Sequence, residues 1–150
     1  MRAYRIVKKR HVLSAFSGDG AKAYGGRRNR PGIPMVYAAE SRALAALEAL
    51  VHFQGAERHI EFVMFEIEIP APLMKREDES SMPPGWRTPD PQAATQDVGS
   101  EWQLEMRSVA LLVPSVLIAG EHCVLLNPEH PDSSRVMIGY PAAFAFDGRL

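Results

Sequence analysis

Apolar residues at every second position between Phe62 and Ile69 constrain the fold of this chain more than any other feature. The apolar set Val63, Phe65, Ile67 and Ile69 alternates with Phe62, Met64, Glu66 and Glu68. A period of two is typical of a strand with one buried face. Further short apolar runs, which we also interpret as strands, cover residues 3–7, 35–38, 109–113, 122–126 and 136–138.

Two helices are predicted around these strands. Ser41 has the side chain of an N-cap for a helix over residues 42–52. One stripe of that helix is apolar and consists of Leu44, Leu47, Leu50 and Val51. Glu48 lies about 90° from the centre of this stripe, so we expect a half-exposed carboxylate. Ser100 is the predicted cap of a shorter helix that ends at Met106.

Two other segments are predicted to be surface loops. Residues 15–32 are rich in glycine and arginine, and we expect none of them in the core. Residues 77–97 are polar and rich in proline, which favours a surface excursion with one helical piece. Because strands outnumber helices and short turns join them, the sequence predicts an α+β fold, with helices packed on a mixed, curved sheet.

Composition narrows the class of protein. A chain of 150 residues that is 46% hydrophobic predicts one domain over residues 1–150. Seventeen basic and eighteen acidic side chains leave a net charge of −1, which argues against direct binding of nucleic acid. The single cysteine, Cys123, lies in an apolar run and is expected to be a buried, inert thiol. Without a signal peptide or an apolar stretch of membrane length, we expect a cytoplasmic protein.

Several familiar sites are excluded by spacing. Residues 18–23 match the glycine fingerprint of dinucleotide-binding folds, but Gly25 and Gly26 follow before the required helix could form two turns. No glycine run is followed by a phosphate-binding lysine, and Ser115 lacks the glycines of a nucleophile elbow. The histidines have no zinc-site spacing, so no metal is predicted. What remains is the arginine-containing loop over residues 25–30, followed by Tyr37 and Glu48.

These remaining residues carry a family resemblance. The pattern Gly26-Arg27-x-Asn29-x-x-Gly32-x-Pro34-x-Val36-Tyr37, followed by Glu48, resembles the core of the RES domain. Two later blocks, in the expected order, are Leu111-Leu112-Val113-Pro114-Ser115 and Leu126-Asn127-Pro128-x-His130-Pro131. The arginine, glutamate and serine that name the family match Arg27, Glu48 and Ser115. The resemblance extends from Tyr4 to about Val136. One position departs from it, because Arg28 stands where the family usually has tryptophan.

The resemblance implies an ADP-ribosyltransferase-like fold, with NAD as substrate. It also implies a toxin of a type II toxin–antitoxin system, neutralised by an antitoxin with an Xre-type helix-turn-helix domain. In NAD the nicotinamide leaves as a neutral molecule, so the reaction needs no general acid. A single carboxylate can stabilise the oxocarbenium-like ribose that forms, and Glu48 is the candidate.

The resemblance and residue chemistry together assign the other candidate residues. Arg27 would hold the pyrophosphate, with Arg5 as a second clamp. Tyr37 would pack on the nicotinamide ring, and Ser115 would hydrogen-bond the nicotinamide amide or the ribose. Asn127 would either brace its loop or touch the substrate.

The sequence leaves the acceptor of the ADP-ribosyl group open. Water would make the protein a glycohydrolase, phosphate a phosphorylase, and a side chain of a host protein an ADP-ribosyltransferase. It also leaves open whether Arg28 attenuates activity. An alternative of another class is a non-catalytic module that uses the arginine loop to bind a phosphorylated ligand or RNA. Against RNA, the strands lack the interleaved aromatic and basic residues of RNA-binding sheets.

Overall fold

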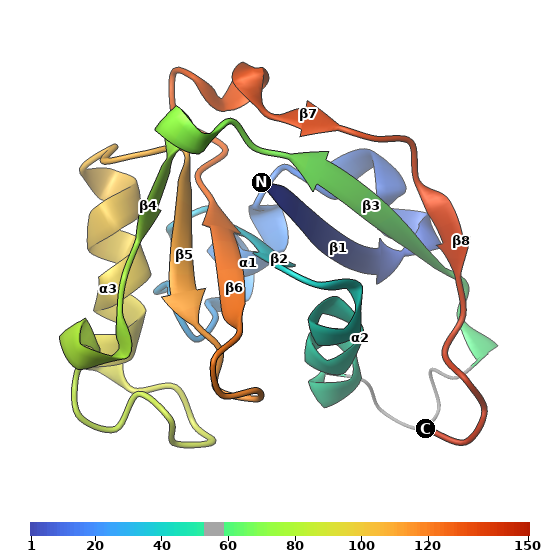
Figure 1. Cartoon of the computed structure of the whole chain (residues 1–150), viewed down its shortest axis with the longest axis horizontal. Coiled ribbons are helices and arrows are strands. Elements are labelled where there is room, and N and C mark those ends of the chain that lie inside the picture. The colour runs from blue at the N-terminus through green and yellow to red at the C-terminus, as the bar shows by residue number, and fades with distance from the viewer. Residues whose placement is uncertain (53–58) are drawn as a thin grey trace.

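A computed structural model describes residues 1–52 and 59–150, and eight strands of this part form one mixed sheet (Figure 1). The strands are β1 (Arg2–Lys8), β2 (Val36–Ala39), β3 (Phe62–Glu68), β4 (Met74–Arg76), β5 (Ala110–Pro114), β6 (His122–Leu126), β7 (Met137–Ile138) and β8 (Ala142–Phe144). Their order is β4-β5-β6-β2-β1-β3-β7, and β8 also pairs with β3. β4 and β5 are parallel and the other pairs are antiparallel. The prediction of an α+β fold with a mixed, curved sheet is confirmed.

Among the described residues, three α-helices lie around this sheet, α1 (Asp19–Tyr24), α2 (Arg42–Val51) and α3 (Ala93–Leu104). Short 3₁₀ helices cover η1 (Lys9–Ser14), η3 (Ala71–Leu73), η4 (Glu79–Ser81) and η5 (Ser133–Arg135). In Figure 1, α3 lies beside β4 and β5, whereas α2 lies below the point where the sheet curls from β6 towards β1. Both helices pack on the same face of the sheet, and α2 borders the candidate site on that face.

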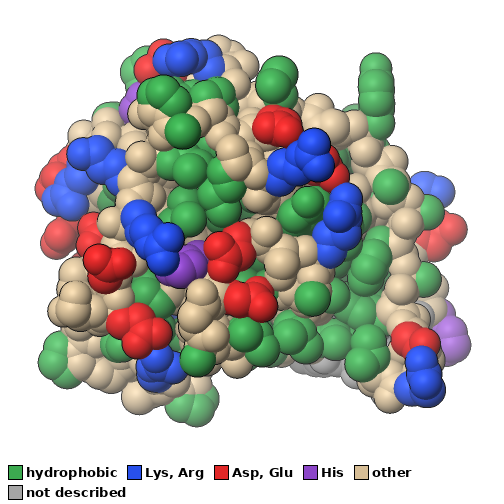
Figure 2. Space-filling view, viewed as in Figure 1, with side chains coloured by type: hydrophobic (Ala, Val, Ile, Leu, Met, Phe, Trp, Pro, Cys, Tyr) green, Lys and Arg blue, Asp and Glu red, His purple; other side chains and the backbone are tan. Residues whose placement is uncertain are grey.

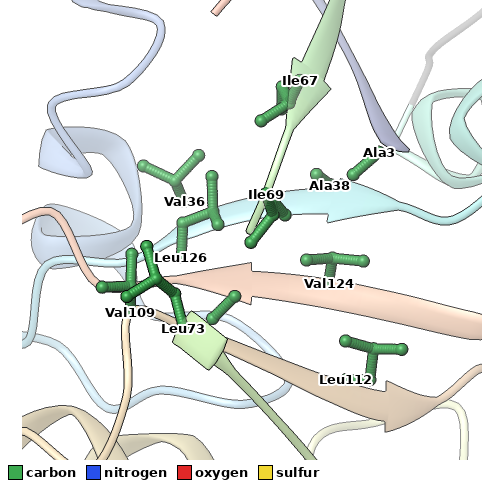
Figure 3. Close-up of a cluster of buried hydrophobic side chains, with 11 residues drawn as sticks. Ala3, Val36, Ala38, Ile67, Ile69, Leu73, Val109, Leu112, Val124 and Leu126 are labelled. Carbon is green, nitrogen blue, oxygen red and sulfur yellow. The ribbon is translucent and has the colours of Figure 1, made fainter. Parts of the chain in front are cut away.

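The alternation that predicted strands also builds the core. On β3, Val63, Phe65 and Ile67 are buried as expected, although Phe62 is buried too. The largest apolar cluster lies inside the curl, where residues of the β1–β3 arm meet those of β2, β5 and β6 (Figure 3). Its members are Ala3, Val36, Ala38, Ile67, Ile69, Leu73, Val109, Ala110, Leu112, Val124 and Leu126.

The opposite face of β5 and β6 is also buried. Leu111, Val113 and Leu125 point away from the first cluster and pack with Trp102 of α3. Because both faces of these two strands are covered, their sequences are continuous apolar runs and not alternating ones. β5 and β6 are therefore held between two apolar clusters, one on each face of the sheet.

Helix α2 begins as predicted, because the Ser41 hydroxyl accepts a hydrogen bond from the Leu44 amide at 3.0 Å. The predicted buried stripe is wrong in part. Leu44 is fully buried, but Leu47 and Val51 are 38% and 60% exposed. The buried face is centred on Leu44 and Ala45, since the small Ala45 faces the cluster with Tyr4 and Ala39. The half-exposed position expected for Glu48 is confirmed.

The predicted helix from Ser100 to Met106 is wrong in its start. Helix α3 begins at Ala93, and Ser100 lies inside it, where its hydroxyl accepts a hydrogen bond from the Arg30 amide at 3.0 Å. The first residues of α3 therefore form a helical piece inside residues 77–97, where the sequence predicted a surface excursion with one such piece. The Ser100 side chain therefore joins α3 to the loop at Arg30 and does not cap the helix.

The prediction that residues 15–32 stay outside the core is also wrong. Helix α1 forms within them, and Ala15, Arg28 and Asn29 are buried. Polar side chains can occupy these positions because each of them finds hydrogen-bond partners. Strands β4 and β8 were not predicted, since each has only three residues at the edge of the sheet.

The surface shown in Figure 2 carries interspersed basic and acidic side chains, with no area of one sign. This distribution agrees with the near-zero net charge of the sequence. None of the helices in the described ranges is long and apolar enough to cross a membrane.

Candidate active site

Two adjoining cavities lie on the face of the sheet that carries α2, opposite the largest apolar cluster, and both are bordered by α2, β2 and β6. The larger has a volume of about 620 Å³, within the range of small-molecule pockets, and the smaller about 160 Å³. Both are lined by Tyr37, Glu48, His52 and Cys123, so these residues mark the junction between the cavities. The larger cavity also reaches the glycine- and arginine-rich loop and the prolines at 89 and 91.

Glu48 is the only carboxylate among the described residues that line either cavity. It projects from the second turn of α2, and the Cys123 thiol donates a hydrogen bond to its Oε1 at 3.2 Å. Burial, and then the neighbouring Glu48 charge, raise the pKa of Cys123 far above its ordinary value. The thiol therefore stays protonated and acts as a donor, which agrees with its predicted inertness.

Tyr37 shapes the arginine turn, by which we mean residues 26–29. Its hydroxyl donates to Asn29 Oδ1 and accepts from the Arg28 amide at 3.1 Å. A Cβ at Gly26 would lie 2.7 Å from this hydroxyl, so the turn requires glycine there. Burial raises the pKa of Tyr37, which keeps the phenol neutral. Its ring lines both cavities, while its polar end is engaged by the protein.

Arg27 lines the larger cavity, but its guanidinium is engaged by backbone. Nη1 donates to the carbonyls of Trp86 and Thr88 at 3.4 and 2.7 Å, and Nη2 donates to that of Pro89 at 2.9 Å. These contacts fasten residues 82–91, which we call the strap, against the arginine turn. The sequence predicted Arg27 as a pyrophosphate ligand, and in the structure it is tied to the strap.

Arg28 also lines the larger cavity and is 3% exposed. It donates to the Pro114 carbonyl at 3.0 Å and to Met82 Sδ at 3.2 Å, and its guanidinium lies 5.6 Å from the Trp86 ring. Burial lowers the pKa of Arg28, partly opposed by the nearby Glu48 carboxylate. Sequence reasoning noted Arg28 only as a departure from the family pattern, and did not predict its burial in the cavity.

Arg5 lines the smaller cavity and not the larger one. It projects from β1, and its guanidinium donates to the carbonyls of Ala15 and Tyr37 at 2.7 and 2.6 Å. Burial lowers the pKa of Arg5 to about 10. The structure thus places this predicted second clamp in the smaller cavity together with Glu48, whereas Arg27 lines only the larger cavity.

Ser115 and Asn127 lie behind the cavity walls and line neither cavity. The Ser115 hydroxyl accepts hydrogen bonds from the amides of Leu117 and Ile118, both at 3.1 Å, and so caps the turn after β5. The Asn127 amide group donates to the Gln103 carbonyl at 3.1 Å, and its Oδ1 accepts from the Glu129 amide. Both are 1% exposed. In this structure each braces a loop.

The predicted residues thus separate into two sets. Glu48, Tyr37 and Arg27 are brought together around the larger cavity, with Arg5 next to them in the smaller one. Cys123 joins this group although the sequence suggested only a buried thiol. The signal that could have found it is the strand period, because Cys123 lies on the same face of β6 as Leu125, which pairs with Tyr37.

The chain matches known proteins along nearly its whole length. Residues 2–147 match the family described as the RES domain. A protein from Yersinia enterocolitica named Toxin Res is 41% identical, over 100% of this chain and 99% of its own length. A protein from Sphingobium sp. named Prs ADP-ribosylating toxin is 36% identical, over 98% of this chain and 94% of its own length.

A solved structure has a similar fold. It is a chain of the crystal structure of the M. tuberculosis MbcT–MbcA toxin–antitoxin complex, which superimposes with a TM-score of 0.75. The match covers 96% of this chain and 84% of that one, at 18% sequence identity. The curled sheet and its helices are therefore found in both proteins.

Proposed function

The chain belongs to the RES-domain family, and from this premise we propose that it is the toxin of a toxin–antitoxin pair and consumes NAD by cleaving the nicotinamide–ribose bond. The observation that carries this proposal is Glu48, the one carboxylate among the described lining residues, at the junction of the two cavities. The names of the Yersinia and Sphingobium relatives support the toxin and ADP-ribosyl parts of it.

The chemistry follows from one negative charge in a partly buried site. The C1′–N bond of the ribose breaks, its electron pair passes to the pyridinium nitrogen, and nicotinamide leaves as a neutral molecule. Positive charge develops on the ribose, and Glu48 stabilises it electrostatically from a rigid helix. The Cys123 thiol holds one carboxylate oxygen and leaves the other for the substrate. The Tyr37 ring packs on the nicotinamide, because it lines both cavities near this carboxylate.

The acceptor forms its bond to C1′ and gives up a proton. Water, inorganic phosphate and a protein side chain all suit the same donor site. The name of the Sphingobium relative favours ADP-ribosyl transfer to a host protein as the second candidate activity. The smaller cavity, between β1 and α2, offers space for a small acceptor next to Glu48.

We further propose that an Xre-type antitoxin controls the toxin by covering the larger cavity. Tyr24, Val51 and Leu117 line this cavity and are 88%, 60% and 39% exposed, which makes its rim apolar. Apolar rims of this kind are typical of surfaces that a partner covers. An acidic or carboxylate-bearing segment of the antitoxin would face Arg27 and Arg28 and exclude the dinucleotide. The toxin acts in the cytoplasm, where its substrate is.

Incubating the purified protein with NAD and following free nicotinamide tests the activity. We expect release that requires the native fold and that stops when the antitoxin is bound. Added phosphate, and a lysate with NAD labelled in the adenylate part, then separate the three acceptors. No nicotinamide release under any of these acceptor conditions would refute the proposed activity.

A further inference from the structure

Within the described part of the chain, no carboxylate forms an ion pair or a hydrogen bond with the buried Arg28 guanidinium, and the Glu48 charge acts on it without direct contact. The two hydrogen-bond acceptors of Arg28 are a carbonyl oxygen and a thioether sulfur, both neutral. A guanidinium has five N–H donors, and these two acceptors satisfy only two of them. A buried charge without a counter-ion destabilises the fold unless something else compensates it. Because the side chain lines the larger cavity, a ligand anion in that cavity would supply the missing partner.

Arg27 is in the reverse situation. Its guanidinium is half-buried, and three backbone carbonyls of the strap already accept from it. A phosphate could reach this side chain only by displacing those contacts. The same contacts hold Trp86, whose ring lies 5.6 Å from the Arg28 guanidinium and 4.4 Å from that of Arg87. Arg27 therefore determines where one side of the Arg28 site lies.

We propose that Arg28 is the anion-binding side chain of the larger cavity, where it takes the phosphate oxygens of the ligand, and that Arg27 is a positioning residue that fastens the strap. A planar guanidinium fork suits two oxygens of one phosphate or of a diphosphate. The rest of the lining is mainly apolar, including Tyr24, Val116 and Leu117, which suits flat rings at either side. The inference rests on the proposed function, because it assigns the phosphates of that dinucleotide to Arg28.

Binding of ADP-ribose and of adenosine, measured by titration calorimetry, tests the assignment without catalysis. ADP-ribose differs from adenosine by the diphosphate and a second ribose, so the change in the ratio of their affinities when an arginine is replaced reports the anion contribution of that arginine. We expect Arg28→Gln to lower that ratio about tenfold or more, since hydrogen bonds to charged groups are the strong ones. Arg27→Gln should weaken both ligands by a similar factor and leave the ratio within about twofold. The proposal is overturned if Arg27→Gln lowers the ratio of ADP-ribose affinity to adenosine affinity while Arg28→Gln leaves that ratio unchanged.

The positioning role of Arg27 has a separate readout. Trp86 lies in the strap, whereas Trp102, the other tryptophan, is in the core at 1% exposure. We expect Arg27→Gln to make the fluorescence of Trp86 accessible to acrylamide, and Arg27→Lys to restore part of the protection. Unchanged quenching in Arg27→Gln overturns the positioning role.

A measurement on the unaltered protein keeps the proposal falsifiable if Arg28→Gln fails to fold. The Nε–Hε signals of the two arginines are followed by NMR while ADP-ribose is added. A shift at Arg28 larger than at Arg27 supports the assignment, and the reverse overturns it. Nicotinamide release is scored separately. Arg28-dependent ADP-ribose binding without nicotinamide release refutes only the proposed function, whereas nicotinamide release with Arg28-independent ADP-ribose binding refutes only this inference.

Discussion

The two walls of the larger cavity are built in opposite ways. The helix wall is α2, which is capped by Ser41. The Ser41 hydroxyl accepts a hydrogen bond from the Leu44 amide, only three residues further along the chain. The turn wall is the arginine turn with its strap, and the guanidinium contacts of its two arginines join residues 54 to 86 positions apart. Its backbone also lies against α3, because a Cβ at Gly99 would overlap the Arg28 carbonyl oxygen. The helix wall carries the carboxylate, and the turn wall carries the two arginines.

The difference indicates where the site is robust and where it is sensitive. A helix held by local hydrogen bonds can present Glu48 even when distant contacts change. The turn has its shape only while the strap, α3 and Tyr37 are all in place. Substitutions in the helix wall should therefore alter chemistry or local stability, and substitutions in the turn wall should alter the whole site.

The largest effect is expected for Glu48→Gln, which tests whether the helix wall carries the chemistry. The substitution keeps the shape and removes the charge that faces the developing cation. We expect nicotinamide release from NAD to fall about a hundredfold or more, with ADP-ribose binding retained.

Glu101→Gln is the matched control for that variant, since Glu101 is an exposed helical glutamate outside both cavities. Its turnover should stay at the unaltered level. A Glu48→Gln protein that keeps more than half of the turnover would contradict the proposed mechanism.

Gly99→Ala tests whether α3 packing fixes the turn wall. The new methyl group would overlap the Arg28 carbonyl oxygen, so helix and turn must separate. We expect a loss of about 2 kcal/mol in the free energy of unfolding, measured by denaturant titration.

Gly20→Ala in α1 is the control, because a Cβ there has nothing within 4 Å. It should leave stability unchanged or raise it by up to about 1 kcal/mol. Equal stabilities for the two alanine variants would show that close packing on α3 does not set the turn.

Tyr37→Phe examines the hydroxyl that joins β2 to the turn. Its removal leaves Asn29 Oδ1 and the Arg28 amide without this partner. We expect a loss of about 1 to 2 kcal/mol in the free energy of unfolding. ADP-ribose affinity should fall as well, because the turn loosens, and calorimetry on the folded variant would measure it. Unaltered stability would mean that the turn does not need this hydroxyl.

The smallest effect is expected at the start of the helix wall. Ser41→Ala removes the N-cap of α2 and should cost about 1 kcal/mol in thermal unfolding measurements. Ser41→Thr keeps a capping hydroxyl and is the control. If Ser41→Ala lowered stability more than Gly99→Ala, the contrast between a local and a long-range wall would be wrong.

Much of this protein is determined by its sequence alone, wherever the cause is local. The period of two over residues 62–69 predicts β3, because alternate side chains of a strand point to opposite faces. Ser41 predicts the start of α2, because an N-cap depends only on a hydrogen bond within the first turn of the helix. The family blocks place Glu48, Tyr37 and Arg27 in one site, and the structure brings all three to one cavity.

Only the tertiary structure decides the division of labour between Arg27 and Arg28. In the sequence they are adjacent and chemically identical, and the family pattern, which selects Arg27, does not show which guanidinium is tied to backbone. In the fold, Arg27 meets carbonyls 59 to 62 residues away, while Arg28 meets the Pro114 carbonyl 86 residues away. Consecutive side chains in a tight turn point in different directions, and distant backbone then determines that Arg27 is tied to the strap and that Arg28 lies buried in the cavity.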